Sequence, residues 1–476
     1  MTSRWECSRQ HLWLYTICTV IAFSSNWQYA FSSTYLNTPV AAFKDYLNES
    51  LHRMDVTMDE TTYSVVWDLI QNIWFVGFFL GIWLSPVFND RLGRKYGLIT
   101  ANTISLVAAV LQFVGVWQFQ PVVLFIGRLV ASICTAVSFQ AIILYLQECS
   151  PTSQRGAISY LSEIVFSGMT IVGMMLGTDE IFGGNLPAVL AVNIIPCFLA
   201  VIVIFFIPET PKFLLIHRRS SSLAGSSVRF FQGSETDVAA VLKETEIEME
   251  AEREVISSCS SVMDLVREPY LRRALLLNIA ALQSTVAFWA LIYNSTTFLK
   301  EINIPDGLAK WSSTAMAFCY FMGTLLGGQI IDRMGRRKIL LPFSTANSVI
   351  LVLFVLFDQL HEYGGGDWWK WPGLVSLLLY GLTYGIGVGA ISWFIGAELS
   401  PHKYRSLMQS AGYSINTISV VISTFTVLPL YHVIGSFGFL ILYTLPSILA
   451  LYYLFRYLPE TKGREIHEIV ADLKRE

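Results

Sequence analysis

The sequence predicts an all-α membrane protein in which twelve transmembrane helices form two pseudo-symmetric six-helix bundles. Hydrophobic residues make up 54% of the chain and charged residues only 14%, whereas a soluble protein carries about 25% charged residues. The apolar residues gather in long runs, each near or above the roughly 20 residues that cross a hydrocarbon core of about 30 Å. Short charged motifs separate these runs and recur in the same order in both halves, which indicates an internal duplication.

The duplication rests on three motif pairs, whose members are separated by about half of the chain. They are DRLGRK from Asp90 and DRMGRR from Asp332, ECSPTSQR from Glu148 and ELSPHKYR from Glu398, and PET from Pro208 and from Pro459. Each Lys or Arg costs about 2.5 to 3.5 kcal/mol at the centre of a spanning helix. The two basic motifs therefore mark places where a pair of helices meets water.

The apolar runs predict six spans in each half. In the first half they are His11–Pro39, 63–87, 97–118, 121–147, 157–178 and 186–207; in the second they are 273–299, 311–331, 339–357, 371–397, 406–430 and 433–455. The His11–Pro39 run is too long for a cleaved signal peptide and is expected to remain as the first helix. The expected domains are a bundle at 1–210, a cytosolic linker with short helices at 211–272, a bundle at 273–458 and a cytosolic tail at 459–476.

The segment between the bundles is polar but is not expected to be wholly irregular. Asp237–Val255 places Glu and Lys at helical i,i+4 spacing. Phe213, Leu214 and Leu215 are apolar side chains that favour burial. We therefore expect short helices on the cytosolic face, with a disordered linker as the alternative.

Charge asymmetry predicts the topology. Most Lys and Arg of the short loops fall on one side of the alternating spans, so both termini are expected in the cytosol of a multi-pass protein, in the plasma membrane. The segment Val40–Thr62 then lies outside, as a polar loop that holds the sequon Asn48-Glu49-Ser50. Asn48 is the expected glycosylation site, because such sequons are modified on the lumenal side.

Composition also excludes several classes of function. A net charge of -3 gives no reason to expect a nucleic-acid partner. The seven cysteines show no metal-ligand spacing and are expected to be reduced packing residues. No nucleotide-binding loop and no catalytic constellation is present, so we expect neither an enzyme nor a bound cofactor or metal. The expected partners are the lipid bilayer and a small-molecule substrate, and the sequence identifies no partner protein.

Several motifs together carry a resemblance to a known family. They are Gly127-Arg128, Glu148 with Pro151, Arg155-Gly156, PETPKFLL from Pro208, DRMGRR from Asp332 and PETKG from Pro459. With these residues in this order, the chain resembles the sugar porter family of the major facilitator superfamily, which includes facilitative glucose and fructose transporters. The resemblance covers essentially the whole chain. It implies the major facilitator fold, a central cavity and alternating access.

The repeated charges are expected to form a cytosolic gate. Paired across helices, acids and bases at the inner helix ends would hold the two bundles together and would separate when the cavity opens inward. The gate residues are Asp90, Arg91, Arg94, Glu148 and Arg155 in the first half, and Asp332, Arg333, Arg336, Glu398 and Arg405 in the second. The alternative is that these charges only direct membrane insertion.

The expected substrate site is less conventional than the scaffold. The resemblance places Glu163 where glucose transporters have a sugar-binding Gln, and Trp289 where they have an Asn. A sugar needs dense polar contacts, because each hydroxyl buried without a partner costs about 1 to 3 kcal/mol. The expected substrate-binding residues are Gln28, Glu163, Gln283, Trp289, Tyr293, Asn294, Trp393 and Asn416.

These features predict a facilitative transporter of a hexose or a similar small hydroxylated solute. The proton-linked relatives carry an Asp in the first helix, where this chain has Tyr29, and no acid occurs within that span. One alternative is a proton-coupled symporter of a polyol or other small polar organic solute, with Glu163 or Asp68 taking the proton. Another alternative is a solute sensor on the same scaffold that binds without transporting.

Overall fold

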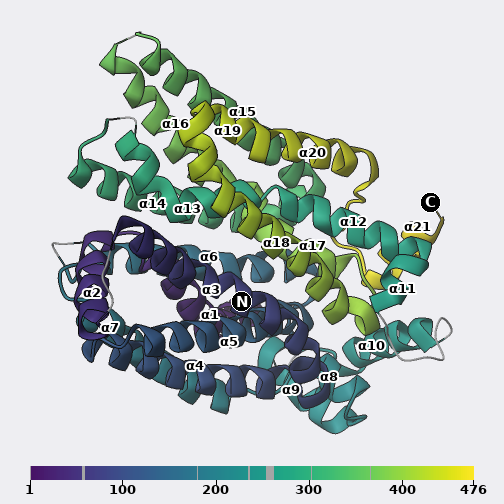
Figure 1. The fold of residues 1–476 in the computed structure, drawn as a ribbon. Helices are drawn as coiled ribbons and strands as arrows, with labels where there is room; N and C mark the ends of the chain where they lie inside the picture. The colour runs from purple at the N-terminus through teal and green to yellow at the C-terminus, as the bar shows by residue number, and fades with distance from the viewer. Residues whose placement is uncertain are drawn as a thin grey trace.

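The computed structural model describes residues 2–55, 59–178, 181–233, 236–253, 262–301, 303–364 and 366–475. Within these ranges all regular elements are helices. Figure 1 shows two lobes side by side, with the first half in purple and blue and the transmembrane part of the second half in teal to yellow. Long helices run in roughly the same direction through both lobes.

Six crossings form the first half. The elements are α1 (Thr2–Thr34), α2 (Val40–Arg53), α3 (Glu60–Pro86) with the π-helix η1 (Val87–Leu92), α4 (Arg94–Trp117), α5 (Pro121–Cys149), the 3-10 turn η2 (Thr152–Gln154), α6 (Arg155–Leu176) and α7 (Leu186–Phe206). All but α2 and η2 contribute to the crossings. Pro86 sits where α3 passes into η1, and the wider turn tolerates its missing N–H.

The second half repeats this order with more interruptions. The elements are α12 (Pro269–Gln283), α13 (Val286–Glu301), α14 (Asp306–Met334), α15 (Arg336–Glu362), η3 (Asp367–Trp369), α16 (Lys370–Thr383), the π-helix η4 (Tyr384–Val388), α17 (Gly389–Glu398), α18 (His402–Ile434), α19 (Phe437–Phe439), the π-helix η5 (Leu440–Thr444), α20 (Leu445–Tyr457) and α21 (Ile466–Arg475). Three crossings are composite: α12 with α13, α16 with η4 and α17, and α19 with η5 and α20.

Ten stretches of the described residues are long and apolar enough to cross a membrane. The other two crossings, α1 and α18, have 33 residues each, a length of about 50 Å at 1.5 Å per residue. They are more polar because they bury polar side chains inside the protein, among them Ser25 and Asn26 in α1 and Gln409 and Ser410 in α18. Such residues do not face lipid, so they do not prevent a crossing.

The two halves meet along two equivalent helix pairs. The fifth crossing of the first half, α6, packs against α14, and the fifth of the second half, α18, packs against α3. Since α3 and α14 are the second crossings of their halves, the interface itself has pseudo-two-fold symmetry. Any cavity between the halves is therefore lined by these four helices and their neighbours.

Short helices cover one end of the molecule, which we call the basic end because DRLGRK and DRMGRR lie there. They are α8 (Pro211–Ile216), α9 (Ser221–Gln232), α10 (Val238–Arg253), α11 (Val262–Arg267) and α21, gathered at the right in Figure 1. The indole N–H of Trp13 in α1 donates to the Phe230 carbonyl of α9 at 2.8 Å. The linker thus lies against the helix ends of the basic end.

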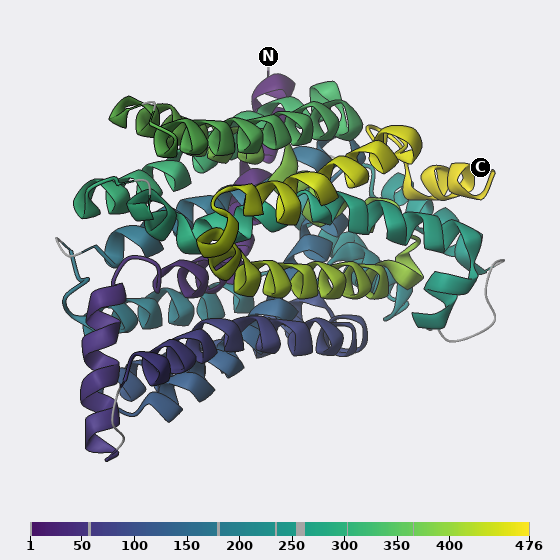
Figure 2. The ribbon, with the colours of Figure 1, turned by 45° about the horizontal axis from the view of Figure 1, so that its top comes forward.

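The opposite end of the molecule carries a helix that the sequence did not suggest. Where a polar loop was expected, α2 lies across the ends of the long helices in both views (Figure 1, Figure 2). Phe43, Tyr46 and Leu47 are buried on its inner side, at the i, i+3 and i+4 spacing of an amphipathic helix. The Tyr46 hydroxyl donates to the Gly115 carbonyl at 3.1 Å and fixes α2 to the end of α4.

Candidate functional site

A central cavity lies between the two halves. Its lining comes from α1, α3, α13, α17 and α18: Tyr29, Trp74, Phe75, Phe78, Trp289, Trp393, Asn416, Thr417 and Val420. The cavity has a volume of about 20 Å³, room for about one water molecule. Aromatic side chains therefore close the centre of the molecule in this conformation, and a larger solute requires the halves to separate.

Tyr29 is the hub of the aromatic side chains around this cavity. Its ring centroid lies 5.3 Å from that of Phe78 in the same half and 5.7 Å from that of Trp289 in the other half. Trp393 in turn lies 6.4 Å from Trp289 and 5.4 Å from Phe139, both edge to face. These separations are those of favourable aromatic pairs, so the rings themselves join the two halves.

Two polar side chains of the cavity lining, Asn416 and Thr417, already donate hydrogen bonds within the protein. The Asn416 amide donates to the Leu282 carbonyl at 2.9 Å and to the Thr285 hydroxyl at 3.1 Å. Both acceptors lie where α12 ends and α13 begins, so Asn416 holds the break in this crossing. The Thr417 hydroxyl donates to the Tyr413 carbonyl at 2.8 Å within α18. Broken helices of this kind line substrate sites in transporters.

Glu163 belongs to a polar face of α6 that points across the interface. Tyr160, Glu163 and Ser167 follow one another at helical spacing and share that face. The Tyr160 hydroxyl donates to the Ile386 carbonyl at 2.8 Å, the Tyr320 hydroxyl donates to Glu163, and the hydroxyls of Ser167 and Thr324 lie 3.0 Å apart. All three partners come from the other half of the molecule.

The crossing next to Glu163 is interrupted by the π-helix η4, and such π-turns are frequent at functional sites. Close packing here depends on glycine. A Cβ on Gly385 would lie 2.3 Å from the Tyr320 carbonyl oxygen, and one on Gly389 would lie 2.6 Å from Glu163 Oε1. The sequence signal was the glycine spacing at 385, 387 and 389.

Three of the eight expected binding residues line the cavity: Trp289, Trp393 and Asn416. Tyr293 lies beside them, with its ring 6.0 Å from Trp289 and 5.5 Å from Phe75. Glu163 is not among the lining residues but packs against Gly389, one helical turn from Trp393. The cavity thus combines fewer of the expected polar residues and more aromatic residues than the sequence suggested.

The remaining three expected binding residues lie apart from the cavity lining. Gln28 faces the interior of the first half, where its Oε1 accepts from Asn193 at 2.9 Å and its Nε2 donates to Ser32 at 3.0 Å. Asn294 donates to the Ala290 carbonyl of its own helix at 3.3 Å. Gln283 is the last residue of α12 and is only partly buried.

Sequence reasoning missed six lining residues: Tyr29, Trp74, Phe75, Phe78, Thr417 and Val420. The expected site was built mainly from polar residues, whereas five of these six are aromatic or aliphatic. A usable signal was the spacing of Trp74, Phe75 and Phe78, which places three large rings on neighbouring positions of one helix face.

The first copy of the charge motifs forms a buried network at the basic end. Arg94 of α4 pairs with Glu148 of α5, with Nη2 2.9 Å from Oε1. The Thr210 hydroxyl donates to the other Glu148 oxygen at 2.6 Å. Glu209 accepts the Lys95 backbone N–H at 3.0 Å and so caps the beginning of α4. Burial raises the pKa of Glu209 to about 7, although the Thr210 and Lys95 hydrogen bonds oppose this shift.

The second copy repeats these contacts group by group. Arg336 Nη2 lies 3.0 Å from Glu398 Oε1, and the Thr461 hydroxyl donates to Glu398 at 2.6 Å. Glu460 accepts the backbone N–H groups of Arg336 at 2.8 Å and Arg337 at 3.2 Å. The PET motifs therefore supply a helix cap and a hydroxyl donor in each half. The sequence predicted neither role, because there the motifs served only to mark the duplication and the family resemblance.

Contacts between the halves at the basic end differ from the expected ion pairs. The Arg–Glu pairs lie within each bundle, whereas Asp332 Oδ2 crosses the interface and accepts the Ala157 backbone N–H at 2.9 Å. His402 Nε2 approaches Glu148 Oε1 across the interface at 3.4 Å. Asp90, the repeat of Asp332, lies near Ser406 of the other half.

The chain's C-terminal segment adds a further link. Arg155 Nη2 lies 3.5 Å from Glu465 Oε2, and Thr152 donates to the same carboxylate. Burial raises the pKa of Glu465, but Arg155 and Thr152 more than offset this, so its pKa lies below the ordinary value.

The remaining expected gate residues differ in burial. Arg405 is buried, while Arg91 and Arg333 have exposed side chains.

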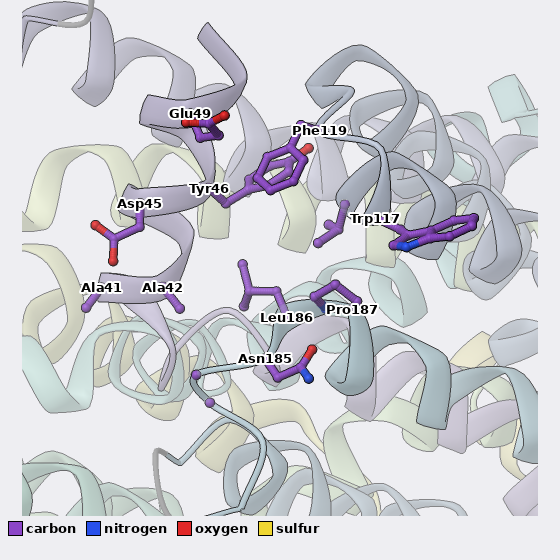
Figure 3. A pocket seen from close by; sticks show the side chains of 13 residues that line it. Ala41, Ala42, Asp45, Tyr46, Glu49, Trp117, Phe119, Asn185, Leu186 and Pro187 are labelled. Carbon is purple, nitrogen blue, oxygen red and sulfur yellow. The ribbon is translucent and has the colours of Figure 1, made fainter. Parts of the chain in front are cut away.

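Two larger hollows lie at the opposite end, each within one half. The hollow in Figure 3 has a volume of about 840 Å³ and is lined by α2, the α4–α5 turn and residues 183–187. The other, about 820 Å³, is lined by residues between Asn303 and Phe437. Because neither is shared by both halves, neither can be opened and closed by their relative motion.

Two further residues singled out from the sequence lie elsewhere. Asn48 is exposed on α2, and the side chain of Asp68 lies outside the described part of the chain.

Comparison with known proteins agrees with this architecture. The family model described as "Sugar (and other) transporter" matches residues 16–473. A relative from Gallus gallus, solute carrier family 2, facilitated glucose transporter member 1, is 26% identical over 93% of this chain and 90% of its own length. The corresponding member 5 from Equus caballus is 25% identical over 94% of this chain and 90% of its own length.

Solved structures identify the fold. The proton:xylose symporter XylE of the major facilitator superfamily, bound to 6-bromo-6-deoxy-D-glucose, superposes with a TM-score of 0.81 at 15% identity, covering 96% of this chain and 99% of that chain. An inward open conformation of XylE superposes with a TM-score of 0.67 at 16% identity, covering 96% and 99%. The twelve-helix major facilitator fold predicted from the sequence is thereby confirmed.

Proposed function

We propose, since the chain belongs to the family of sugar and other transporters, that it carries a hexose or a similar small hydroxylated solute down its gradient by alternating access. The protein is a multi-pass membrane transporter of sugars, and the relatives that it matches are named as glucose transporters. We propose in addition the class of solute, transport without coupling to a proton gradient, and the residues that bind the solute and close the gate.

One observation carries the proposal. The central cavity is lined by both halves and is closed on both sides by contacts between them. Toward the opposite end, Tyr29 packs on Trp289, and the Asn37 amide donates to the Ile292 carbonyl at 2.9 Å. Toward the basic end, Asp332 holds Ala157. Opening one side while the other stays closed gives alternating access.

The roles of individual residues follow from this geometry. Trp289, Tyr293 and Trp393 offer ring faces on which a pyranose can stack, while Asn416 and Glu163 offer hydrogen-bonding groups. We place the basic-end gate at the inter-bundle hydrogen bond of Asp332, supported by the buried Arg–Glu pairs that fix the neighbouring helix ends.

Passive transport is favoured by the composition of α1. Between Gln10 and Thr34 this helix has no carboxylate, and Tyr29 occupies the cavity position. The second candidate is proton-coupled transport through Glu163, because that carboxylate is buried at the moving interface.

The orientation in the membrane is also part of the proposal. The basic end holds DRLGRK and DRMGRR and therefore faces the cytosol by the positive-inside rule. The opposite end then faces outward at the plasma membrane, with Asn48 of α2 available for glycosylation. Both termini lie on the cytosolic side.

Transport in reconstituted vesicles tests the proposal. Labelled D-glucose and D-fructose should enter vesicles that contain the protein, and unlabelled sugar inside should accelerate entry by exchange. Uptake should be equal with and without an inward proton gradient. Binding of the sugars without exchange would instead identify a sensor, and uptake that needs the gradient would identify a symporter. Empty vesicles and the Asp332→Ala variant are the controls.

A further inference from the structure

Glu163 is a carboxylate buried near the middle of the molecule. Glu163 is 5% exposed, and its carboxylate accepts a hydrogen bond from the hydroxyl of Tyr320 in the other half. The Cα of Gly389 is so close that a Cβ there would lie 2.6 Å from Glu163 Oε1. One helical turn further along α17, Trp393 lines the central cavity. The carboxylate therefore lies behind the cavity lining, against the residue that precedes Trp393 by one helical turn.

The helices packed against Glu163 bring no cation to it. They are α1, α5, α14 and α17. Lys and Arg are absent from residues 10–34 of α1, 129–147 of α5, 311–331 of α14 and 389–397 of α17. The charged residues of these helices lie toward their ends: Arg4, Glu6, Arg9, Arg128, Glu148, Asp306, Lys310, Asp332, Arg333 and Glu398, with His11 as a further titratable group. A charge in such a place is costly unless something compensates it.

Aromatic rings surround the same point. Phe288 and Tyr384 stack with their centroids 4.0 Å apart, and Tyr320 lies 4.8 Å from Phe288. Trp289, the next residue along α13, reaches the cavity. Ring faces carry negative potential and attract ammonium groups, most strongly in a desolvated site. A carboxylate inside an aromatic enclosure is a favourable arrangement for an organic ammonium.

Two hydrogen-bond donors of the cavity lining are already used within the protein. The Asn416 amide nitrogen is used by Leu282 and Thr285, and Thr417 donates to Tyr413. An ionised carboxylate accepts hydrogen bonds but donates none. A solute that supplies N–H donors and a positive charge satisfies Glu163 better than one that supplies only hydroxyls.

We propose that the site selects an amino sugar, a hexose in which a protonated amine replaces one hydroxyl, with the ammonium paired to Glu163 and the ring against Trp289 and Trp393. This inference rests on the proposed function, because it names the substrate class of the same site. It accounts for a carboxylate at the interface that has no cation from the neighbouring helices. The substrate supplies the cation, and the carboxylate binds it as the halves close.

Three probe sugars of closely related shape test the selection in reconstituted vesicles at mildly acidic pH. D-glucosamine carries the ammonium, N-acetyl-D-glucosamine has a neutral amide at the same carbon, and D-glucose has a hydroxyl. We expect a KM for glucosamine at least tenfold below that of either neutral sugar. With 100 mV inside negative, glucosamine should accumulate by up to about 50-fold, since one charge is worth about 2.3 kcal/mol per 100 mV, whereas glucose should only equilibrate.

Variants separate the charge from the fold. Glu163→Gln should lower the preference for glucosamine over glucose at least tenfold, and Glu163→Asp should restore part of it. Ser167→Ala, which removes a neutral contact on the same face of α6, should change the KM of both sugars by the same factor and leave the preference intact.

Two outcomes overturn the inference while the proposed function stands. In the first, glucose is transported and Glu163→Gln changes all three sugars equally. In the second, glucose uptake requires an inward proton gradient and loses that requirement in Glu163→Gln, which would make the proton the compensating cation. If none of the three sugars is transported or bound, the proposed function fails as well.

Discussion

Replacing Asp332 by alanine should weaken the closure of the basic end. Asp332 Oδ2 accepts the Ala157 backbone N–H at 2.9 Å, and Ala157 lies in the first turn of α6. The carboxylate therefore makes a charged hydrogen bond across the interface and also faces the positive end of a helix dipole. Arg336 keeps its partner Glu398 in the variant, so the bundle itself loses only one ion pair.

The size of the effect follows from these contacts. A hydrogen bond to a charged group contributes about 1.5 to 3 kcal/mol. The side chain of Asp332 is 23% exposed, so solvent screening favours the lower part of that range. We therefore expect about 1.5 to 2 kcal/mol, which shifts the equilibrium toward the state open at the basic end by roughly 10- to 30-fold.

Cysteine labelling measures this shift. Gln147 is buried, and its Nε2 lies 3.5 Å from the Phe394 carbonyl of the other half. A Gln147→Cys reporter, in a background without the seven native cysteines, should react with a maleimide about 10- to 30-fold faster in Asp332→Ala. Arg333→Ala, whose side chain is exposed next to Asp332, is the matched control and should change the rate less than twofold.

A second route to the same state is Gly156→Ala. The added Cβ would lie 2.3 Å from Asp332 Oδ1, so it would displace the carboxylate without removing it. Equal labelling rates in Asp332→Ala and Arg333→Ala would refute the assignment of Asp332 as an inter-bundle latch.

Two further variants test the cap and the broken helix. The pKa of Glu209 is raised to about 7 in the folded protein, above the ordinary value near 4.3. Its contribution to stability is therefore fully present below about pH 4.3 and lost as the pH rises through about 7; Tm should fall from pH 5 to 8, and Glu209→Gln should flatten that slope. Asn416→Ala leaves the Leu282 carbonyl and Thr285 hydroxyl without their amide donor, a cost of about 1 to 3 kcal/mol. It should therefore raise the hexose KM more than Gln283→Ala, whose side chain lies outside the cavity lining.

The fold was predictable because its determinants are local and repeated. The number of sufficiently long apolar runs gives the number of crossings, and the repeat of DRLGRK reveals the duplication. Neither inference depends on knowing which helices are in contact. The composite crossings were not predictable in detail. A break between α12 and α13 is stabilised by Asn416, more than a hundred residues away, and no local pattern contains that information.

The substrate site was predicted only in part for a similar reason. In a soluble protein, burial distinguishes core aromatic residues from surface ones, but in a membrane helix a ring facing lipid and a ring facing a cavity have the same hydropathy. The spacing of Trp74 and Phe78 groups their rings on one helix face, but hydropathy does not distinguish whether that face meets lipid or the cavity. Glu163 could be singled out, because a carboxylate within a span is conspicuous wherever it points.

The two sides of the cavity are closed by different forces, and this difference bears on how a sugar enters. At the basic end, water can replace the hydrogen bond that Asp332 accepts from Ala157, so opening costs only the net value of that bond, about 1.5 to 3 kcal/mol. Toward the opposite end, separating Tyr29 from Trp289 and Phe75 from Tyr293 exposes apolar surface at about 25 cal/mol per Å². Water does not compensate for that loss, but the apolar face of a pyranose ring does. A substrate arriving from the opposite end can therefore take the place of one ring in each stacked pair, which makes entry and binding a single exchange of contacts.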